Sequence, residues 1–201
     1  MESFYFLIDE MLQAPPEARA AAEERIRNAF EAERAVLALD MSGFSLSVRR
    51  SGIVAHLCEI RRVQRLVLPL IEDHGGDLVK CVADNVLAVF PESRQAVAAA
   101  IAINEAIAKA GAEGPKGRVL TVGIGIDFGR LLLIPGKDAF GDPVNIAHKL
   151  GEDIARANEV LTTQEVARGL DPARYALEPM TLSIAGLELH ACKVTARAGA
   201  A

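Results

Sequence analysis

The chain has 201 residues, of which 51% are hydrophobic and 24% charged, and its formal net charge is −5 at pH 7. A chain of this length and composition can bury a full core, and it fits one domain with modest extensions. A negative net charge without a long Lys/Arg run argues against a general nucleic-acid surface, because such surfaces neutralise many phosphates. We therefore expect no nucleic-acid partner.

Neither the apolar runs nor the cysteines indicate a membrane span or an oxidising compartment. No run reaches the roughly 18 to 20 apolar residues that cross a bilayer, and residues 1–11 carry acids where a signal peptide carries positive charge. Cys58, Cys81 and Cys192 lie far apart, without the spacing of metal ligands or of a disulfide framework. We expect a soluble, cytoplasmic chain with free thiols and no membrane partner.

Two helical patterns open the chain, and a strand follows them. A break at Pro15 and Pro16 separates a short amphipathic segment from an Ala-, Glu- and Arg-rich one, so we predict a helical extension over residues 1–33. Residues 34–40 (RAVLALD) are a short apolar run that ends on an acid. Such a run predicts a buried strand with the carboxylate of Asp40 at its tip.

The middle of the chain alternates between helical and hairpin patterns. The apolar spacing and the turn residues predict, in order, a helix over 52–73, a hairpin over 77–90, an Ala-rich helix over 91–110 and a second strand pair over 119–134. Asp84 stands at the turn of the first hairpin, and we place the hinge of the second strand pair at Asp127.

The rest of the chain predicts a helix over 144–157, a short strand over 160–162, and a small helix with a final strand pair. A short sheet with helices packed on one face fits this order of elements, and the fold class is therefore α+β. We assign residues 34–194 to one domain and expect residues 195–201 to be a disordered tail.

Asp40 and Asp84 are the first candidates for chemistry. One ends a strand and the other occupies a hairpin turn, so neighbouring strands can hold the two carboxylates side by side. Hard divalent cations such as Mg²⁺ prefer carboxylate oxygens together with substrate phosphates, and a pair of cations suits phosphoryl chemistry. Acids at strand ends are more often solvated loop residues, so the two aspartates alone do not decide between these interpretations.

Four sequence blocks give these acids a context. In chain order they are DMSGFS (40–45), GGDLVKCVAD (75–84), GIDFG (125–129) and DAFGDPVNIAHKL (138–150). In order and spacing they resemble the class III adenylyl/guanylyl cyclase family, over about residues 34–194. The resemblance implies a ferredoxin-like cyclase sheet and a lyase of signal transduction that converts ATP to 3′,5′-cyclic AMP and pyrophosphate.

For the metal half of the site, the resemblance implies that Asp40 and Asp84 bind two divalent metal ions, Mg²⁺ or Mn²⁺. The backbone carbonyl of Met41 is a further candidate ligand, and Gly43 and Phe44 match the turn that lies near the triphosphate. Such ions favour attack of the ribose 3′-hydroxyl on the α-phosphorus and the departure of pyrophosphate.

For the substrate half, Lys80 and Asp138 match the family's purine-selecting pair. Their chemistry suits adenine, because lysine donates to a ring nitrogen and aspartate accepts from the exocyclic amine. Asn145 matches the asparagine that orients the ribose, and Lys149 stands where the family has its transition-state arginine. In this family the two halves come from different subunits, which implies a homodimer with shared sites.

Four positions depart from the family pattern, one of them Ala83, which stands where a glycine usually precedes the second metal acid. Lys149 keeps the charge of the usual arginine but lacks its planar fork of donors. Gly123 and Ala185 replace a phosphate-binding arginine and a late lysine, and Arg130 or Lys137 are the nearby cations available to compensate. Loss of one such contact typically costs about two to three orders of magnitude in rate, so we expect an enzyme of low activity.

Two alternatives to an adenylyl cyclase stay open, the first of them motivated by these departures. One is a degenerate cyclase domain that binds nucleotide and dimerises as a regulatory module. The other keeps the enzyme and changes the base, since some cyclases of this architecture accept GTP or pyrimidine nucleotides.

Overall fold

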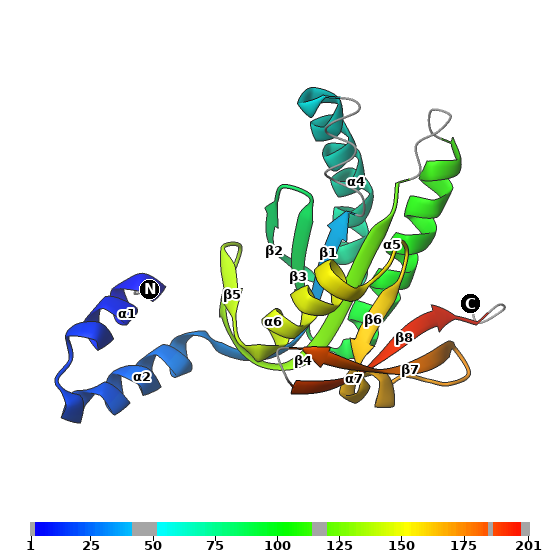
Figure 1. Cartoon of the computed structure of the whole chain (residues 1–201). Coiled ribbons are helices and arrows are strands. Elements are labelled where there is room, and N and C mark those ends of the chain that lie inside the picture. The colour runs from blue at the N-terminus through cyan, green and yellow to red at the C-terminus, as the bar shows by residue number, and fades with distance from the viewer. Residues whose placement is uncertain (1–2, 42–51, 114–119, 185–186, 198–201) are drawn as a thin grey trace.

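The computed structural model describes residues 3–41, 52–113, 120–184 and 187–197. Its centre is an eight-stranded sheet in the order β2-β3-β1-β4-β6-β8-β7, with β5 paired to β4 off this path (Figure 1). The strands are β1 (Glu31–Met41), β2 (Asp77–Val82), β3 (Asn85–Phe90), β4 (Val122–Ile134), β5 (Asp138–Phe140), β6 (Val160–Thr163), β7 (Tyr175–Ile184) and β8 (Leu187–Ala196). Neighbouring strands are antiparallel except for the parallel pair β4 and β6.

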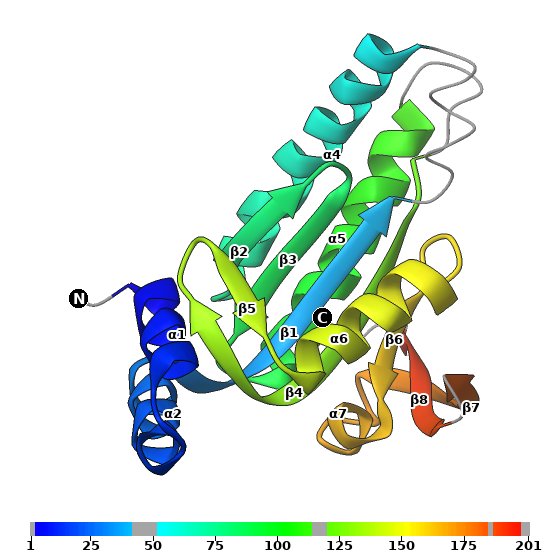
Figure 2. The ribbon, with the colours of Figure 1, turned by 60° about the vertical axis from the view of Figure 1, so that its left-hand side comes forward.

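Helices cover both faces of this sheet (Figure 2). They are α4 (Ile53–Asp73), α5 (Ser93–Glu113), α6 (Asp142–His148), the π-helical η1 (Lys149–Ile154) and α7 (Gln164–Arg168). Leu37 and Leu39 of β1 join the core beneath α4 and α5, whereas Val36 and Ala38 join the core beneath α6. The predicted α+β class is confirmed, with one correction: α6 lies on the face opposite α4 and α5, where Gly125 of β4 lets it approach closely.

Strand β4 is continuous, whereas the sequence led us to place a hinge at Asp127. It pairs with the whole of β1, Glu31–Met41, without interruption. Asp127 lies in the middle of this ladder, only 6% exposed, and its Oδ1 accepts a hydrogen bond of 2.6 Å from the hydroxyl of Thr163. The hinge prediction was wrong because a buried carboxylate with a partner can stay inside a strand, and the partner is not visible in the local sequence.

The N-terminal helices α1 (Phe4–Gln13) and α2 (Pro16–Phe30) form a hairpin beside β4 and β5 (Figure 1). The ring of Phe4 stacks on that of Phe140 in β5, with centroids 5.6 Å apart. Helix α2 runs into β1 without a linker, so β1 begins at Glu31, inside the segment that we predicted to be helical.

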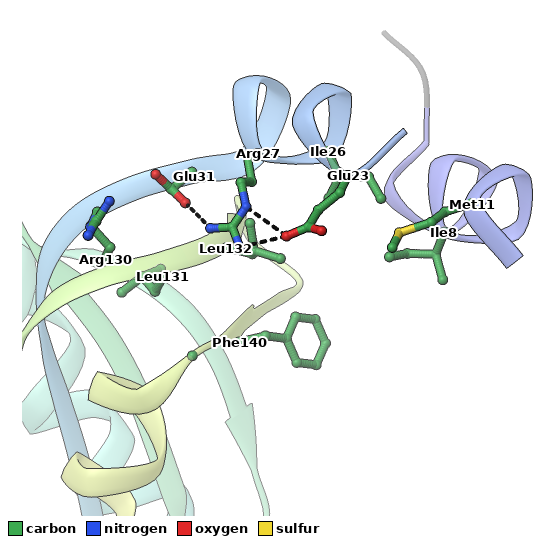
Figure 3. Close-up of a pocket in the computed structure, with 11 residues that line it drawn as sticks. Ile8, Met11, Glu23, Ile26, Arg27, Glu31, Arg130, Leu131, Leu132 and Phe140 are labelled. Atoms are coloured by element: carbon green, nitrogen blue, oxygen red, sulfur yellow. Dashed lines mark hydrogen bonds and ion pairs between the residues drawn. The ribbon is translucent and has the colours of Figure 1, made fainter. Parts of the chain in front are cut away.

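A cavity of about 720 Å³ lies between this hairpin and the end of β4 (Figure 3). Its lining includes apolar side chains from α1, α2, β4 and β5, namely Ile8, Met11, Ile26, Leu131, Leu132 and Phe140. Arg27 donates at its rim to Glu23 at 2.7 Å and to Glu31 at 2.9 Å. The hairpin and its cavity thus lie at the end of β1 that is remote from Asp40.

The C-terminal strand is longer than predicted. Thr195 and Ala196, which we expected to begin a disordered tail, pair with β7 as the last residues of β8, and residues 198–201 lie outside the described residues. Among the helices of the described ranges, none is both long and apolar enough to cross a membrane.

Candidate active site

Asp40 and Asp84 lie near each other at one end of the sheet. β1 carries Asp40 one residue before its end, and the turn between β2 and β3 carries Asp84. Burial, followed by the charge of Asp84, raises the pKa of Asp40 to about 6. Burial also raises the pKa of Asp84. A cation that binds between two half-buried carboxylates stabilises their charged forms, so carboxylates with raised pKa values favour cation binding.

Ala83 and Met41 are the chain neighbours of the two acids. Ala83 precedes Asp84 with a φ of 52°, in the left-handed region that favours glycine. Met41 is buried, and its backbone hydrogen bond to Asp40 offsets part of the rise in the pKa of that carboxyl. Gly43 and Phe44 lie outside the described residues.

Lys80 and Asp138 form an ion pair between β2 and β5, although they are 58 residues apart in the sequence. Lys80 Nζ lies 2.6 Å from Asp138 Oδ1. The pair forms because the far end of β4 bends and carries β5 over β2 (Figure 2). Burial raises the pKa of Asp138, but hydrogen bonds from Lys80 and from the N–H of Ala139 outweigh it, and the net pKa is lowered. Asp138 is therefore ionised at neutral pH.

Asn145 and Lys149 lie one turn apart, where α6 continues into η1. Pro143 in the first turn suits the start of α6, because its fixed φ is already helical. The side chain of Asn145 is exposed, whereas Lys149 forms an ion pair with Asp153 four residues further on. The charge of Lys149 is thus engaged within its own helix.

Gly123 lies beneath η1, where a side chain has no room. A Cβ at this position would lie 2.5 Å from the carbonyl oxygen of Gly151 and 3.1 Å from the Cβ of Ala155. The missing arginine is therefore tied to the packing of η1 on the sheet. Within one chain Arg130 is remote from this position, because Gly123 stands opposite Asp40 whereas Arg130 stands near the other end of the β1–β4 ladder.

Lys137 was the second cation expected to compensate, and Ala185 the position of the missing lysine. Lys137 is in the turn between β4 and β5, directly before Asp138, and is therefore beside the ion pair of Lys80. Ala185 falls outside the described residues.

Two contacts beside the acid pair were not predicted. Glu152 of η1 accepts a hydrogen bond of 3.0 Å from the side chain of Asn85, the residue after Asp84. Its Oε1 also lies 2.6 Å from Nδ1 of His148. The His148–Glu152 spacing of four was an available signal, since such residues share a helix face. The contact with Asn85 was not accessible, because 67 residues separate the partners.

Among the described residues, no group of three or more His, Cys, Asp or Glu side chains is placed to hold a metal ion. The acid pair is thus a site of two carboxylates. Cations that bind substrate phosphates commonly take their remaining ligands from phosphate, water and backbone oxygens.

Comparison with known proteins gives sequence relatives but no matching family model. "Putative adenylate cyclase 3" of Rhizobium meliloti (strain 1021) is 31% identical over 129 residues, 64% of this chain and 21% of that protein. "Serine/threonine-protein kinase pkn2" of Myxococcus xanthus is 25% identical over 163 residues, 79% of this chain and 19% of that protein. The chain spans about a fifth of the length of these two curated relatives.

A solved structure gives the fold. The crystal structure of an adenylate/guanylate cyclase/hydrolase from Silicibacter pomeroyi matches with a TM-score of 0.70 and 26% identity, over 82% of this chain and 96% of that one. This likeness agrees with the four sequence blocks and with the relative from Rhizobium meliloti. The chain therefore contains a class III adenylyl/guanylyl cyclase catalytic domain.

Proposed function

We propose that this domain is an adenylyl cyclase, which converts ATP to 3′,5′-cyclic AMP and pyrophosphate. The ion pair between Lys80 and Asp138 carries the proposal. An ammonium donor beside a carboxylate acceptor has the polarity that a ring nitrogen and the exocyclic amine of adenine require. Guanine has an oxygen in place of that amine, and this oxygen would meet the carboxylate of Asp138 as a second acceptor.

We assign the acid pair, Asp40 and Asp84, to two divalent metal ions, Mg²⁺ or Mn²⁺. The donor set fits, because these ions prefer carboxylate oxygens, and burial with mutual repulsion leaves the two acids in need of positive charge. The carbonyl oxygen of Met41 is a further donor in this assignment. When bound, such ions acidify the ribose 3′-hydroxyl and neutralise the leaving pyrophosphate.

We assign Asn145 to the ribose and Lys149 to the phosphate in the transition state. The exposed amide of Asn145 is accessible to a substrate on the α6 face. Lys149 must leave Asp153 to reach a phosphate, and one ammonium does not reproduce the planar fork of an arginine. We therefore expect low turnover. Gly43 and Phe44 contact the triphosphate in this assignment.

The working unit in this proposal is a homodimer, in which each site combines the acid pair of one copy with Lys80 and Asp138 of the other. Exposed apolar side chains beside the ion pair support it, since Leu78, Val82 and Phe140 are 40%, 59% and 40% exposed. A two-fold dimer then holds two equal sites. The free cysteines favour the cytoplasm, a reducing compartment.

The test is cyclic nucleotide formation by the purified protein. ATP, GTP, CTP and UTP are supplied in turn with Mg²⁺ and with Mn²⁺, and Asp40→Ala and Asp84→Ala are measured beside the wild type. We expect cyclic AMP from ATP, and a loss of at least about a hundredfold in each variant, because a metal site contributes several kcal/mol to the transition state. Full activity in either variant would remove the acid pair from the mechanism.

A regulatory module that binds nucleotide without turnover is the second candidate. Two observations favour it: Gly123 leaves no room for an arginine, and Lys149 is paired with Asp153. If this candidate is right, the folded dimer binds ATP in calorimetry and yields no cyclic product with either metal. Metal-dependent turnover that is lost in Asp84→Ala excludes it.

A further inference from the structure

Three elements beside the acid pair meet at one side chain, that of Glu152. Its Oε1 accepts a hydrogen bond of 3.0 Å from Nδ2 of Asn85 and lies 2.6 Å from Nδ1 of His148. Asn85 directly follows Asp84, at the start of β3. Glu152 therefore ties the turn that carries Asp84 to the helical layer over β1.

The close approach of η1 to the sheet brings Glu152 to this place. Gly151 lies so near the sheet that a Cβ on it would be 2.6 Å from the carbonyl oxygen of Ala38 and 2.8 Å from the nitrogen of Gly125. Ala38 stands two residues before Asp40 on β1, so η1 rests on the strand just short of the acid pair. π-helical turns are rare and recur at functional sites.

Glu152 places a third negative charge beside the acid pair. Its charge acts on both Asp40 and Asp84, and its side chain is 33% exposed. A carboxylate with that exposure would relieve the repulsion by turning into solvent. Asn85 and His148 hold it instead, which indicates that these contacts are firm.

We propose that Glu152 is a positioning residue of the metal site: it holds Asn85 and thereby fixes the turn between β2 and β3, so that Asp84 faces Asp40. The inference rests on the proposed function, because it takes the two aspartates as cation ligands. A ligand whose neighbours already hold it binds its cation more tightly, since less ordering remains to be done on binding.

The test is Mn²⁺ binding by the purified, nucleotide-free protein, measured from the electron paramagnetic resonance signal of free Mn²⁺. Glu152→Ala and Asn85→Ala remove the two ends of the hydrogen bond. We expect each to weaken Mn²⁺ affinity about tenfold or more, as loss of a partner of a metal ligand usually does. The double variant should be no weaker than either single one, because both act through one contact.

Two further variants make the comparison specific. Glu152→Gln keeps an acceptor for Asn85 and should recover most of the affinity lost in Glu152→Ala. Glu23→Ala on α2 removes another carboxylate that accepts a side-chain hydrogen bond, from Arg27, and should leave Mn²⁺ binding unchanged. Hydrogen exchange without metal should show faster exchange in the β2–β3 turn of Glu152→Ala and Asn85→Ala only.

The outcomes separate this inference from the proposed function. If the wild type binds Mn²⁺, Asp84→Ala does not, and Glu152→Ala with Asn85→Ala bind as the wild type does, the acid pair stands and the role of Glu152 is overturned. If the wild type itself binds no Mn²⁺, the proposed metal site fails and the positioning role fails with it. Lower unfolding temperatures with unchanged Mn²⁺ affinity would reduce Glu152 to a structural link and also overturn the inference.

Discussion

In the proposed function, base selection depends on Lys80 and Asp138, whose side chains lie 2.6 Å apart. The double exchange Lys80→Glu with Asp138→Cys places an acceptor where the donor was and removes the acceptor opposite it. We expect kcat/KM for GTP relative to ATP to rise at least about tenfold, the value of one hydrogen bond to a charged group. Lys109→Glu, on the exposed face of α5, is the control. An unchanged nucleotide ratio in the double variant would discredit the base assignment.

Asp127 gives the fold a pH dependence of its own. Burial raises the pKa of Asp127, and the hydrogen bond from Thr163 offsets only part of that rise. The folded state therefore binds this proton more tightly than the unfolded state, so the free energy of unfolding falls as pH rises from the ordinary aspartate pKa through the raised one.

Asp127→Asn should remove this dependence, because the amide keeps an acceptor for Thr163 and carries no titrating proton. We expect the variant to be more stable than the wild type near neutral pH and to converge with it in acid. Thermal unfolding over a pH series measures the difference. Parallel stability curves for the two proteins would contradict the assignment of the raised pKa to Asp127.

At the residue scale, the resemblance to the cyclase family paired Lys80 with Asp138, which the sequence pattern by itself could not do. Lys80 and Asp138 are far apart in the sequence, and only the bend of β4 brings them together. The pairing of Lys149 with Asp153 was within reach, since charges four apart on a helix attract each other. The contact of Glu152 with Asn85 was not, because it depends on how a helix rests on the sheet.

At the scale of elements, three glycines close the contact between η1 and the sheet. A Cβ at Gly123, Gly125 or Gly151 would lie 2.5, 2.1 or 2.6 Å from a backbone oxygen. Gly123→Arg restores the arginine of the family, yet we expect it to lower the free energy of unfolding by more than about 3 kcal/mol, since it overpacks the contact and buries a charge. Cyclase activity should not rise.

Urea unfolding measures the loss in free energy of unfolding of the Gly123→Arg variant, and a substitution at a second glycine is the control. Gly169→Ala is the control, because the nearest atom to its new Cβ is 3.6 Å away, and it should change the free energy of unfolding by no more than about 0.5 kcal/mol. A Gly123→Arg variant as stable as the wild type would mean that η1 lifts from the sheet at little cost.

The long helices were predictable because each buries one face of a regular apolar repeat, and β1 and β3 because each contains a continuous apolar run that is buried on both faces. β1 and the β2–β3 hairpin lie close to their predicted ranges. The face that α6 covers was not predictable, because Gly125 and Gly129 resemble turn residues until a helix is known to cross them. The same ambiguity placed the hinge at Asp127. The π-helical turn of η1 has no local signature in the sequence.

At the scale of the whole molecule, the proposed site between two copies should be recoverable from two variants that each lack one half of it. Asp40→Ala lacks the acid half, and Lys80→Ala lacks the base half. After denaturation and refolding in equal amounts, we expect about one quarter of the wild-type cyclic AMP production, since about half of the dimers are mixed and each holds one intact site. Asp40→Ala refolded with Asp84→Ala should recover nothing, because both lack the same half. No recovery in the first mixture would contradict the shared site.

The glycine contact beneath η1 also limits how this domain can evolve. An arginine at Gly123 would require η1 to move in the same step, so a lineage that accepts one mutation at a time must pass through an unstable ancestor. Lys149, with 42% of its side chain exposed, is under no such restriction, and one nucleotide change converts a lysine codon to an arginine codon. Descendants under selection for faster turnover should therefore acquire a guanidinium at position 149 first and leave Gly123 unchanged.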